Sequence, residues 1–153
     1  ENPKEDPRRA LTEQLIEDLG ENGSIVVYSQ SFEKGHLREL ADIFPEHKAK
    51  ILAIVDRIVD LRDVFSKGYV YDKAMEGSAS IKYVLPALFP GDPGLNYHNL
   101  DQVHNGTEAP AEFLSMPESG PERDKTRDNL LAYCGLDTYA ELKILQWLND
   151  HSS

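Results

Sequence analysis

Two acidic residues and one tyrosine have types and positions that suit metal-dependent cleavage of a phosphodiester. Tyr133 and Asp137 are four residues apart, so they share one face if that segment is a continuous helix. On such a face the carboxylate would bind a divalent cation, and the phenol would orient the attacking water or contact the scissile phosphate. Glu33 stands where a strand pattern changes into a helix pattern. In open α/β sheets, ligands bind beyond the carboxyl ends of the strands.

The same residues also fit ordinary helix ends. Gly135 is of the type that follows the last residue of a helix, and Asp137 or Thr138 would cap the next helix. Thr138 with Glu141 also matches a capping box. On spacing alone, capping is favoured over catalysis at this position. Ser31 is a fair N-cap, and Glu33 after it would gain about 0.3–1 kcal/mol from the helix dipole. For Asp137 and for Glu33, the helix-end role and the catalytic role are therefore both left open.

The elements that must position these residues follow from the apolar pattern. The β-branched and aromatic run from Ile25 to Tyr28, behind a turn cluster, predicts a buried strand over residues 24–28. Pro86 or Pro90 is expected to halt a short helix that begins near residue 81. Residues 61–71 are predicted to be irregular with pieces of strand, and residues 91–120 to be rich in loops. Further helices are predicted over residues 7–19, 31–44, 46–59, 121–134 and 138–149.

A single strand cannot make a complete sheet, because its edges would stay unpaired. We therefore expect more strands within residues 61–71 and 95–103, and others from chain that precedes residue 1. The sequence starts without methionine, which is typical of a piece of a longer protein. The expected architecture is one α/β domain over residues 1–153, truncated on its N-terminal side. An open sheet edge would also allow a homodimer.

Composition narrows the classes of function. The 153 residues carry 16 Lys and Arg against 27 Asp and Glu, a net charge of −11, which argues against a simple cationic surface for nucleic acid. It does not exclude an enzyme that holds a phosphodiester through divalent metals, since such a site is itself acidic. No apolar run is long enough to span a membrane. The single cysteine, Cys134, fits a reducing compartment, so a cytoplasmic protein is expected.

Four motifs in order carry a resemblance to a known family. They are Tyr28-Ser-Gln-Ser-Phe-Glu33, Asp60-Leu61, Gly77-Ser-x-Ser-Ile-Lys-x-Val-Leu-Pro86 and Tyr133-x-x-x-Asp137. Together they resemble an uncharacterised bacterial domain family that is grouped with RNase-H-like 3′–5′ exonucleases of the DEDD type. That family is often found C-terminal to a RecB-like nuclease domain. The resemblance covers nearly the whole chain, and its last motif is the tyrosine variant.

The resemblance implies a role for each matching residue. Glu33 occupies the place of the second motif's aspartate, Asp137 would be the last ligand of a two-metal site for Mg²⁺ or Mn²⁺, and Tyr133 would orient the nucleophilic water. Asp60 resembles an acid at the end of a later strand, with a structural role. Ser31, Phe32 and Lys82 are the candidate contacts for a DNA or RNA substrate. For Lys82, an ordinary solvent-facing lysine is the default interpretation.

Two departures from the family pattern affect the expected activity. Glu33 is one methylene longer than the usual aspartate, which would displace a ligand oxygen. The Asp-x-Glu pair of the first motif does not occur in this chain, so the chain alone is expected to be a poor catalyst within an active parent protein. The alternative function is a non-catalytic RNase-H-like module that binds a partner or positions nucleic acid.

Overall fold

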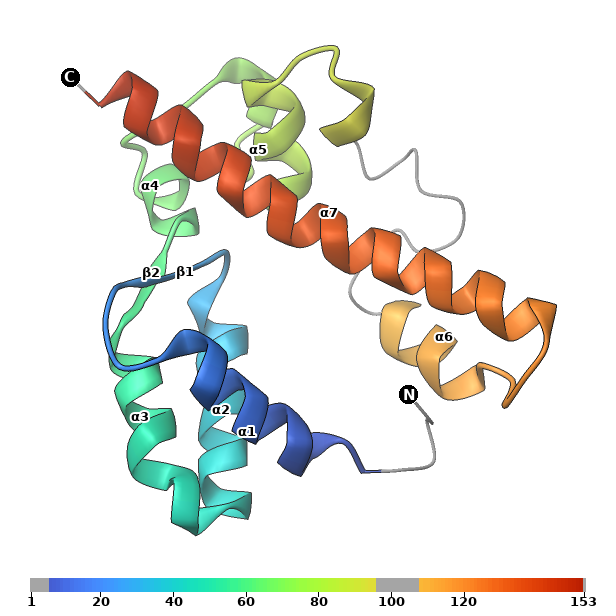
Figure 1. Ribbon diagram of the computed structural model, residues 1–153. Coiled ribbons are helices and arrows are strands. Elements are labelled where there is room, and N and C mark those ends of the chain that lie inside the picture. Colours follow the sequence, from blue (N-terminus) through green and yellow to red (C-terminus); the bar gives the residue numbers. More distant parts are fainter. Residues whose placement is uncertain (1–5, 96–107, 153) are drawn as a thin grey trace. The chain divides into compact units, whose positions relative to one another are not determined.

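The computed structural model describes residues 6–95 and 108–152, which form two compact units (Figure 1). The first unit is Asp6–Val64, and the second runs from Phe65 to the C-terminal end. Helices dominate both, and the first unit also contains a two-stranded parallel sheet. Each unit has its own set of buried apolar side chains, so each is described by itself below.

The first unit is a strand–helix–helix–strand crossover preceded by one helix. Parallel strands cannot be joined by a tight turn, and here two helices make the connection between them. The strands pair with Ile25 opposite Ile58 and Val27 opposite Asp60. The elements in order are α1 (Arg8–Leu19), β1 (Ile25–Val27), α2 (Gln30–Ile43), the 3-10 turn η1 (Pro45–His47), α3 (Lys48–Asp56) and β2 (Ile58–Asp60).

The second unit is built around one long helix. Its helix α7 (Pro121–His151) packs against α5 and α6, and the buried side chains of α7 are Tyr133, Leu136, Ala140 and Ile144. Helix α4 lies where the chain passes from the first unit to the second. The remaining elements are α4 (Arg62–Ser66), η2 (Lys73–Met75), α5 (Ile81–Leu88), η3 (Pro93–Leu95) and α6 (Glu108–Ser115).

The sequence predicted α1, β1 and α2 to within one or two residues, but the helix over residues 46–59 was wrong at its end. Helix α3 stops at Asp56, and Ile58 and Val59 belong to β2. Both side chains fit the helical spacing of the preceding residues. They are β-branched, however, and in the fold they pair with β1, which supplies a partner that local spacing cannot reveal. This strand lies just before the region where one was expected.

Residues 121–149 were predicted as two helices and form one. Helix α7 runs without a break through Gly135, and the hydroxyl of Thr138 donates to the carbonyl of Cys134 inside the helix instead of capping a new one. Tyr133 and Leu136, on either side of Gly135, are both buried. Capping is therefore excluded as the role of Asp137.

Of the two prolines predicted to halt the helix near residue 81, Pro90 is confirmed, because α5 continues through Pro86 and ends at Leu88. Two smaller expectations differ from the structure. Residues 61–71 contain α4 and no strand, and the region expected to be loop-rich contains α6. Most of the strand predicted over residues 95–103 lies outside the described residues. None of the described helices combines the length and the apolar character needed to cross a membrane.

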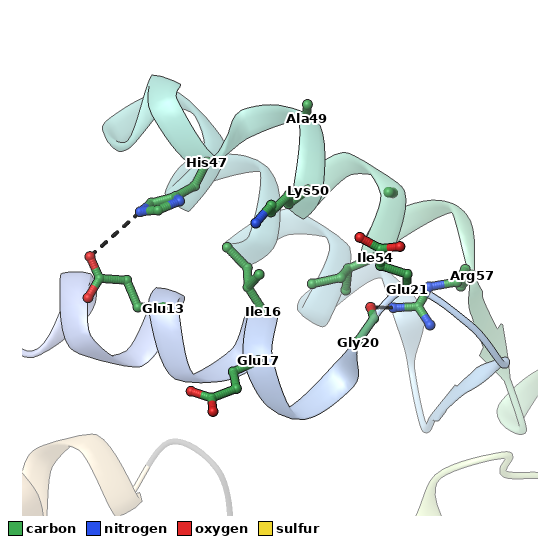
Figure 2. A pocket seen from close by; sticks show the side chains of 11 residues that line it. Glu13, Ile16, Glu17, Gly20, Glu21, His47, Ala49, Lys50, Ile54 and Arg57 are labelled. Carbon is green, nitrogen blue, oxygen red and sulfur yellow. Dashed lines mark hydrogen bonds and ion pairs between the residues drawn. The ribbon is translucent and has the colours of Figure 1, made fainter.

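Arg57, which lies between α3 and β2, ties this point of the chain to the end of α1 and to the loop before β1. Its guanidinium donates to the carbonyl oxygens of Leu19, Gly20, Asn22 and Gly23 at 2.7–3.1 Å, and Figure 2 shows the contact with Gly20. One planar side chain thereby satisfies two carbonyls at the end of α1, those of Leu19 and Gly20, and two in the loop before β1. The Arg57 carbonyl in turn accepts from the amide of Ile25 at 3.0 Å.

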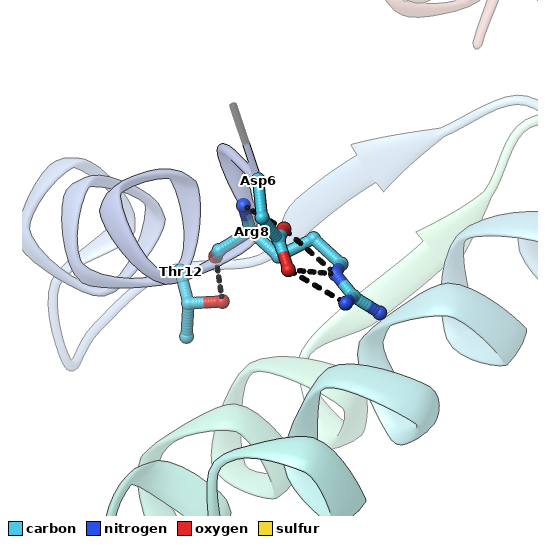
Figure 3. A network of polar contacts seen from close by, with 3 residues as sticks. All are labelled: Asp6, Arg8 and Thr12. Atoms are coloured by element: carbon cyan, nitrogen blue, oxygen red, sulfur yellow. Dashed lines mark hydrogen bonds and ion pairs between the residues drawn. The ribbon is translucent and has the colours of Figure 1, made fainter. Parts of the chain in front are cut away.

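A smaller polar network starts α1. The carboxylate of Asp6 accepts from the backbone amide of Arg8 at 3.1 Å and from its guanidinium at 2.6–3.1 Å (Figure 3). One turn later the hydroxyl of Thr12 donates to the Arg8 carbonyl at 2.7 Å. Thr12 is the one residue of α1 that is fully buried, so an internal hydrogen bond allows a polar side chain at that place.

We expect Arg57→Ala to lower the free energy of unfolding by about 2–3 kcal/mol, because hydrogen bonds from a charged group contribute about 1.5–3 kcal/mol each and are not additive. Arg57→Lys should recover less than half of the loss, since an ammonium lacks the planar fork. Urea unfolding, with hydrogen exchange at the Ile25 amide, measures both. Lys50→Ala on the exposed side of α3 is the control, and an equal loss there would contradict the role of Arg57.

Gly135→Ala should stabilise the chain by about 0.5–1 kcal/mol, since glycine inside a helix is unfavourable by that amount and an added Cβ there meets no atom within 4 Å. Gly120→Ala is the control, because Gly120 has φ +98° and alanine should destabilise that turn. Thermal unfolding followed by circular dichroism separates the two. Destabilisation by Gly135→Ala would indicate a helix end at this position.

Candidate functional site

The carboxylate of Asp60 organises the carboxyl ends of both strands. It lies at the end of β2 and accepts hydrogen bonds from three backbone amides, those of Ser29, Gln30 and Arg62, all at 2.9 Å. Two of these amides belong to the segment that leads from β1 into α2. These contacts confirm the structural role predicted for Asp60. They occupy most of the hydrogen-bonding capacity of its carboxylate, so little of that capacity remains for a ligand.

Ser29 takes an unusual backbone conformation at this junction. Its φ and ψ are 80° and 60°, in the left-handed region, which disfavours residues with a Cβ by about 1 kcal/mol or more. The hydrogen bond from its amide to Asp60 supports that turn. Helix α2 therefore begins at Gln30, and the prediction of Ser31 as its N-cap is wrong: Ser31 is exposed in the first turn.

Glu33 lies in the first turn of α2 and is half-buried. Within the described part of the chain its Oε2 atom is shielded from solvent and has no hydrogen-bond partner. Burial raises the pKa of Glu33 above its ordinary value of 4.5, and the nearby charge of Asp60 adds to the increase. An ionised carboxylate at this place is thus unfavourable for the fold, and its free oxygen can serve as a ligand or accept a proton.

Two aromatic rings flank Glu33 on the outside of α2. Phe32 is 66% exposed, and its ring meets the ring of His36 edge-on, with centroids 4.5 Å apart. His36 also contacts the carboxylate of Glu39 at 3.2 Å. A large exposed apolar ring next to a half-buried acid is available for stacking or for a partner.

Tyr28 directly follows β1. Burial raises the pKa of its phenol, so the phenol keeps its proton.

The other candidate pair lies in the second unit. Tyr133 and Asp137 follow each other by one turn on α7, so the predicted shared helical face is confirmed. The side chain of Tyr133 is buried at 8% exposure, and that of Asp137 is half-buried. Both make polar or electrostatic interactions within the fold. The pair therefore stands beside the buried side of the helix and not on its outer surface.

Lys82 is the second residue of α5, also in the second unit. The first turn of this helix has no acidic residue, and Ser80 at the N-cap position makes no capping hydrogen bond with its side chain. Instead the hydroxyl of Ser78 accepts from the Ser80 amide at 3.2 Å. A cation at the positive end of a helix adds to the field there, so this turn is electropositive.

The described residues fit a divalent metal in part. Mg²⁺ and Mn²⁺ take oxygen ligands, and the free Oε2 of Glu33 is of that kind. Across residues 6–95 and 108–152, however, no three His, Cys, Asp or Glu side chains are grouped so that they could hold a metal ion.

Comparison with known proteins places the chain in a family. The family described as "Domain of unknown function (DUF2779)" matches residues 1–80, more than half of the sequence. The chain belongs to the DUF2779 family. The matched part contains the whole first unit of the structure, with β1, β2, Asp60 and Glu33.

Two curated relatives of this DUF2779 chain are much longer proteins. "Uncharacterized protein MG366" of Mycoplasma genitalium is 30% identical over 152 residues, which cover 89% of the chain and 22% of that protein. "Uncharacterized protein MG366 homolog" of Mycoplasma pneumoniae is 28% identical over 154 residues, with 93% and 23% covered. The chain thus spans less than a quarter of the length of either relative. No solved structure matches it significantly.

Sequence reasoning missed two features around these residues. The first is the turn at Ser29, which carries no glycine or asparagine to signal a left-handed backbone. The second is the part played by Arg57, whose four acceptors lie 34–38 residues away in the sequence. The local indication of this role is the position of Arg57, a charged residue between a helical segment and a β-branched segment.

Glu33→Gln should make the chain more stable than wild type at pH 7 but not below pH 4.5. Because the pKa of Glu33 is raised in the folded chain, the protonated form contributes its full stabilisation below the pKa of the unfolded chain. That contribution is lost as the pH rises through the folded pKa, because the carboxylate then ionises while buried. A glutamine stays neutral at every pH, so the variant does not lose this contribution. Urea unfolding between pH 4 and pH 8 tests this, with Glu39→Gln as the control for loss of one negative charge on α2. A constant difference across the pH range would contradict it.

Proposed function

We propose that this chain is part of a metal-dependent 3′–5′ exonuclease-like enzyme that cleaves DNA or RNA phosphodiesters, with an RNase-H-like fold. The observation that supports this most is Glu33. Its Oε2 atom lies beyond the carboxyl end of a parallel strand, is shielded from water and has no hydrogen-bond partner in residues 6–95 and 108–152. Such an atom is unfavourable for stability. Such groups concentrate at functional sites.

In this proposal Glu33 and Asp137 are carboxylate ligands of Mg²⁺ or Mn²⁺. A bound divalent ion would stabilise negative charge on the phosphate and lower the pKa of a coordinated water. The chain's own contribution is to hold each carboxylate: Asp60 fixes the turn from which α2 projects Glu33, and the continuous α7 fixes Asp137 one turn from Tyr133. Tyr133 would orient the attacking water.

Substrate contacts are proposed for the residues around these acids. The exposed ring of Phe32, supported edge-on by His36, suits stacking on a base, which contributes about 1–3 kcal/mol per base. The exposed hydroxyl of Ser31 in the same turn can donate to a phosphate oxygen. The electropositive first turn of α5, with Lys82, suits a phosphate group.

The second candidate function is a non-catalytic module that positions nucleic acid. It is favoured by the state of Asp60, whose carboxylate is occupied by three backbone amides, and by the lack of a three-residue metal cluster among the described side chains. Under this alternative, Phe32 and Lys82 would contact nucleic acid, and Glu33 would carry no metal. The two proposals therefore differ in whether binding at Glu33 depends on a divalent ion.

A titration of the chain with Mn²⁺ tests the metal role without an activity assay. At about millimolar Mn²⁺, we expect paramagnetic broadening of amide resonances in the first turn of α2 and around Asp137. Glu33→Gln should abolish the first effect and Asp137→Asn the second. Asp56→Asn, an exposed acid on α3, is the control. Broadening that is unchanged in Glu33→Gln would defeat the metal role of Glu33.

The catalytic role is tested in the longest natural polypeptide that carries this chain. We expect Mg²⁺- or Mn²⁺-dependent release of nucleotides from the 3′ end of single-stranded DNA or RNA. Asp137→Asn and Tyr133→Phe should lower kcat by about 10²-fold or more while nucleic-acid binding is retained. Binding without any release, in the wild type as well, would favour the positioning module instead.

A further inference from the structure

The segment between α4 and η2 presents two tyrosine rings to solvent. Tyr69 and Tyr71 are 78% and 67% exposed, and Val70 between them is half-buried. In the part of the chain that the structure describes, neither tyrosine makes a hydrogen bond or a ring contact. The packing of the second unit thus makes little use of these rings, and their faces are accessible to a ligand.

Both ends of this segment are held in the fold. Phe65 before it and Met75 after it are buried. The amide of Gly68 donates to the carbonyl of Phe65 at 3.0 Å. The amide of Met75 donates to the carbonyl of Asp72 at 3.0 Å, and the amide of Ala74 donates to the Asp72 carboxylate at 2.8 Å. An anchored backbone loses less conformational freedom when its side chains bind a ligand.

The spacing of the two rings suits nearby bases of one strand. The exposed, half-buried, exposed order at residues 69–71 indicates that both rings lie on the same side of the segment. Their Cα atoms are at most about 7 Å apart, and successive bases of a strand rise by about 3.4 Å. Both tyrosines can therefore contact bases one or two positions apart. In a duplex the faces of the bases are covered by their neighbours, so this contact requires unpaired bases.

The side chains around the rings favour nucleic acid over a protein partner. A protein interface surrounds its aromatic anchors with closely packed contacts that exclude water. Here the neighbouring exposed side chains are polar: residues 66–73 read Ser-Lys-Gly-Tyr-Val-Tyr-Asp-Lys, and the one aliphatic residue among them, Val70, is half-buried. Aromatic rings that lie beside lysines are the combination that binds single strands, through base faces and phosphates.

The charge of the segment determines the kind of binding that it supports. Lys67 and Lys73 against Asp72 give residues 67–73 a net charge of +1, in a chain whose net charge is −11. Electrostatic attraction of phosphates to this segment is therefore weak. Stacking on a neutral phenol ring does not depend on net charge, so it allows an acidic chain to hold a polyanion. The affinity should accordingly depend only weakly on salt.

We propose that Tyr69 and Tyr71 form a stacking site for unpaired bases of single-stranded DNA or RNA, with Lys67 and Lys73 beside it for the phosphates. The proposal rests on the proposed function, because it takes nucleic acid as the ligand. It adds a contact in the second unit that needs no metal ion, and it makes the ligand single-stranded. The site holds the strand and takes no part in hydrolysis.

Binding of labelled oligonucleotides without divalent ions tests the site. An oligothymidine of about 12 nucleotides, measured by fluorescence anisotropy in EDTA, should bind with a Kd on the order of 100 μM at low salt. A duplex of the same length should bind at least tenfold more weakly. The slope of log Kd against log salt concentration should not exceed about 1.4, the value for two phosphate contacts. Equal affinity for the duplex, or no binding of the single strand, would overturn the proposal and favour a protein partner for the two rings.

Variants of the rings locate the binding. Tyr69→Ala and Tyr71→Ala should each weaken single-strand binding at least fivefold, because each removes one stacking face. Tyr69→Phe and Tyr71→Phe keep the ring and should stay within twofold of the wild type. Tyr139→Ala is the control, since Tyr139 is 50% exposed on α7 and lies outside the segment. Unchanged affinity in both alanine variants of the segment, or an equal loss in Tyr139→Ala, would overturn the proposal.

The same variants separate this proposal from the hydrolytic one. If Tyr69→Ala and Tyr71→Ala lose binding but the longest natural polypeptide releases no nucleotides, the stacking site stands and the hydrolytic proposal fails. If that polypeptide releases nucleotides while both alanine variants bind single strands as the wild type does, the stacking site alone fails.

Discussion

The carboxylate of Asp60 joins the ends of the two parallel strands to the start of α2, and the geometry of the first unit's candidate site depends on that joint. Three backbone amides converge on this one side chain. They hold Ser29 in a left-handed conformation, which turns the chain sharply out of β1. The direction of α2 and the position of Glu33 in its first turn both follow from this turn. A carboxylate with a structural role thus positions a carboxylate whose Oε2 atom has no hydrogen-bond partner among the described residues.

The two acids illustrate how stability and function can be divided between neighbouring residues. Asp60 satisfies backbone groups that would otherwise lack a hydrogen-bond partner, whereas the buried Oε2 of Glu33 finds no partner in the part of the chain that the structure describes. Natural proteins tolerate such groups where activity requires them, because the rest of the fold supplies enough stability. Arg57 makes a comparable contribution in the first unit, since its guanidinium satisfies four carbonyls, two at the end of α1 and two in the loop before β1.

Local patterns were enough for α1, β1 and α2, because each has its own spacing and its own boundary residues. They failed where tertiary packing decided. Ile58 fits the helical spacing of α3 but pairs with Ile25, and Gly135 resembles a helix end but lies between buried residues that keep α7 continuous. The sequence also identified Glu33 and Asp137 as candidates. The contacts of Asp60 with the start of α2 depend on residues about 30 positions apart, beyond the reach of periodicity.

Gly135 has a mechanical consequence for α7. It lies between Tyr133 and Asp137 and has no side chain to pack, and bends in helices concentrate at residues of this kind. The part of α7 from Gly135 to His151 is about 24 Å long, so a change of direction at Gly135 would displace its end, with the stacked rings of Trp147 and His151. The same bend would alter the spacing between phenol and carboxylate. The geometry of the Tyr133–Asp137 pair thus depends on whether α7 stays straight at the one residue between them that has no side chain.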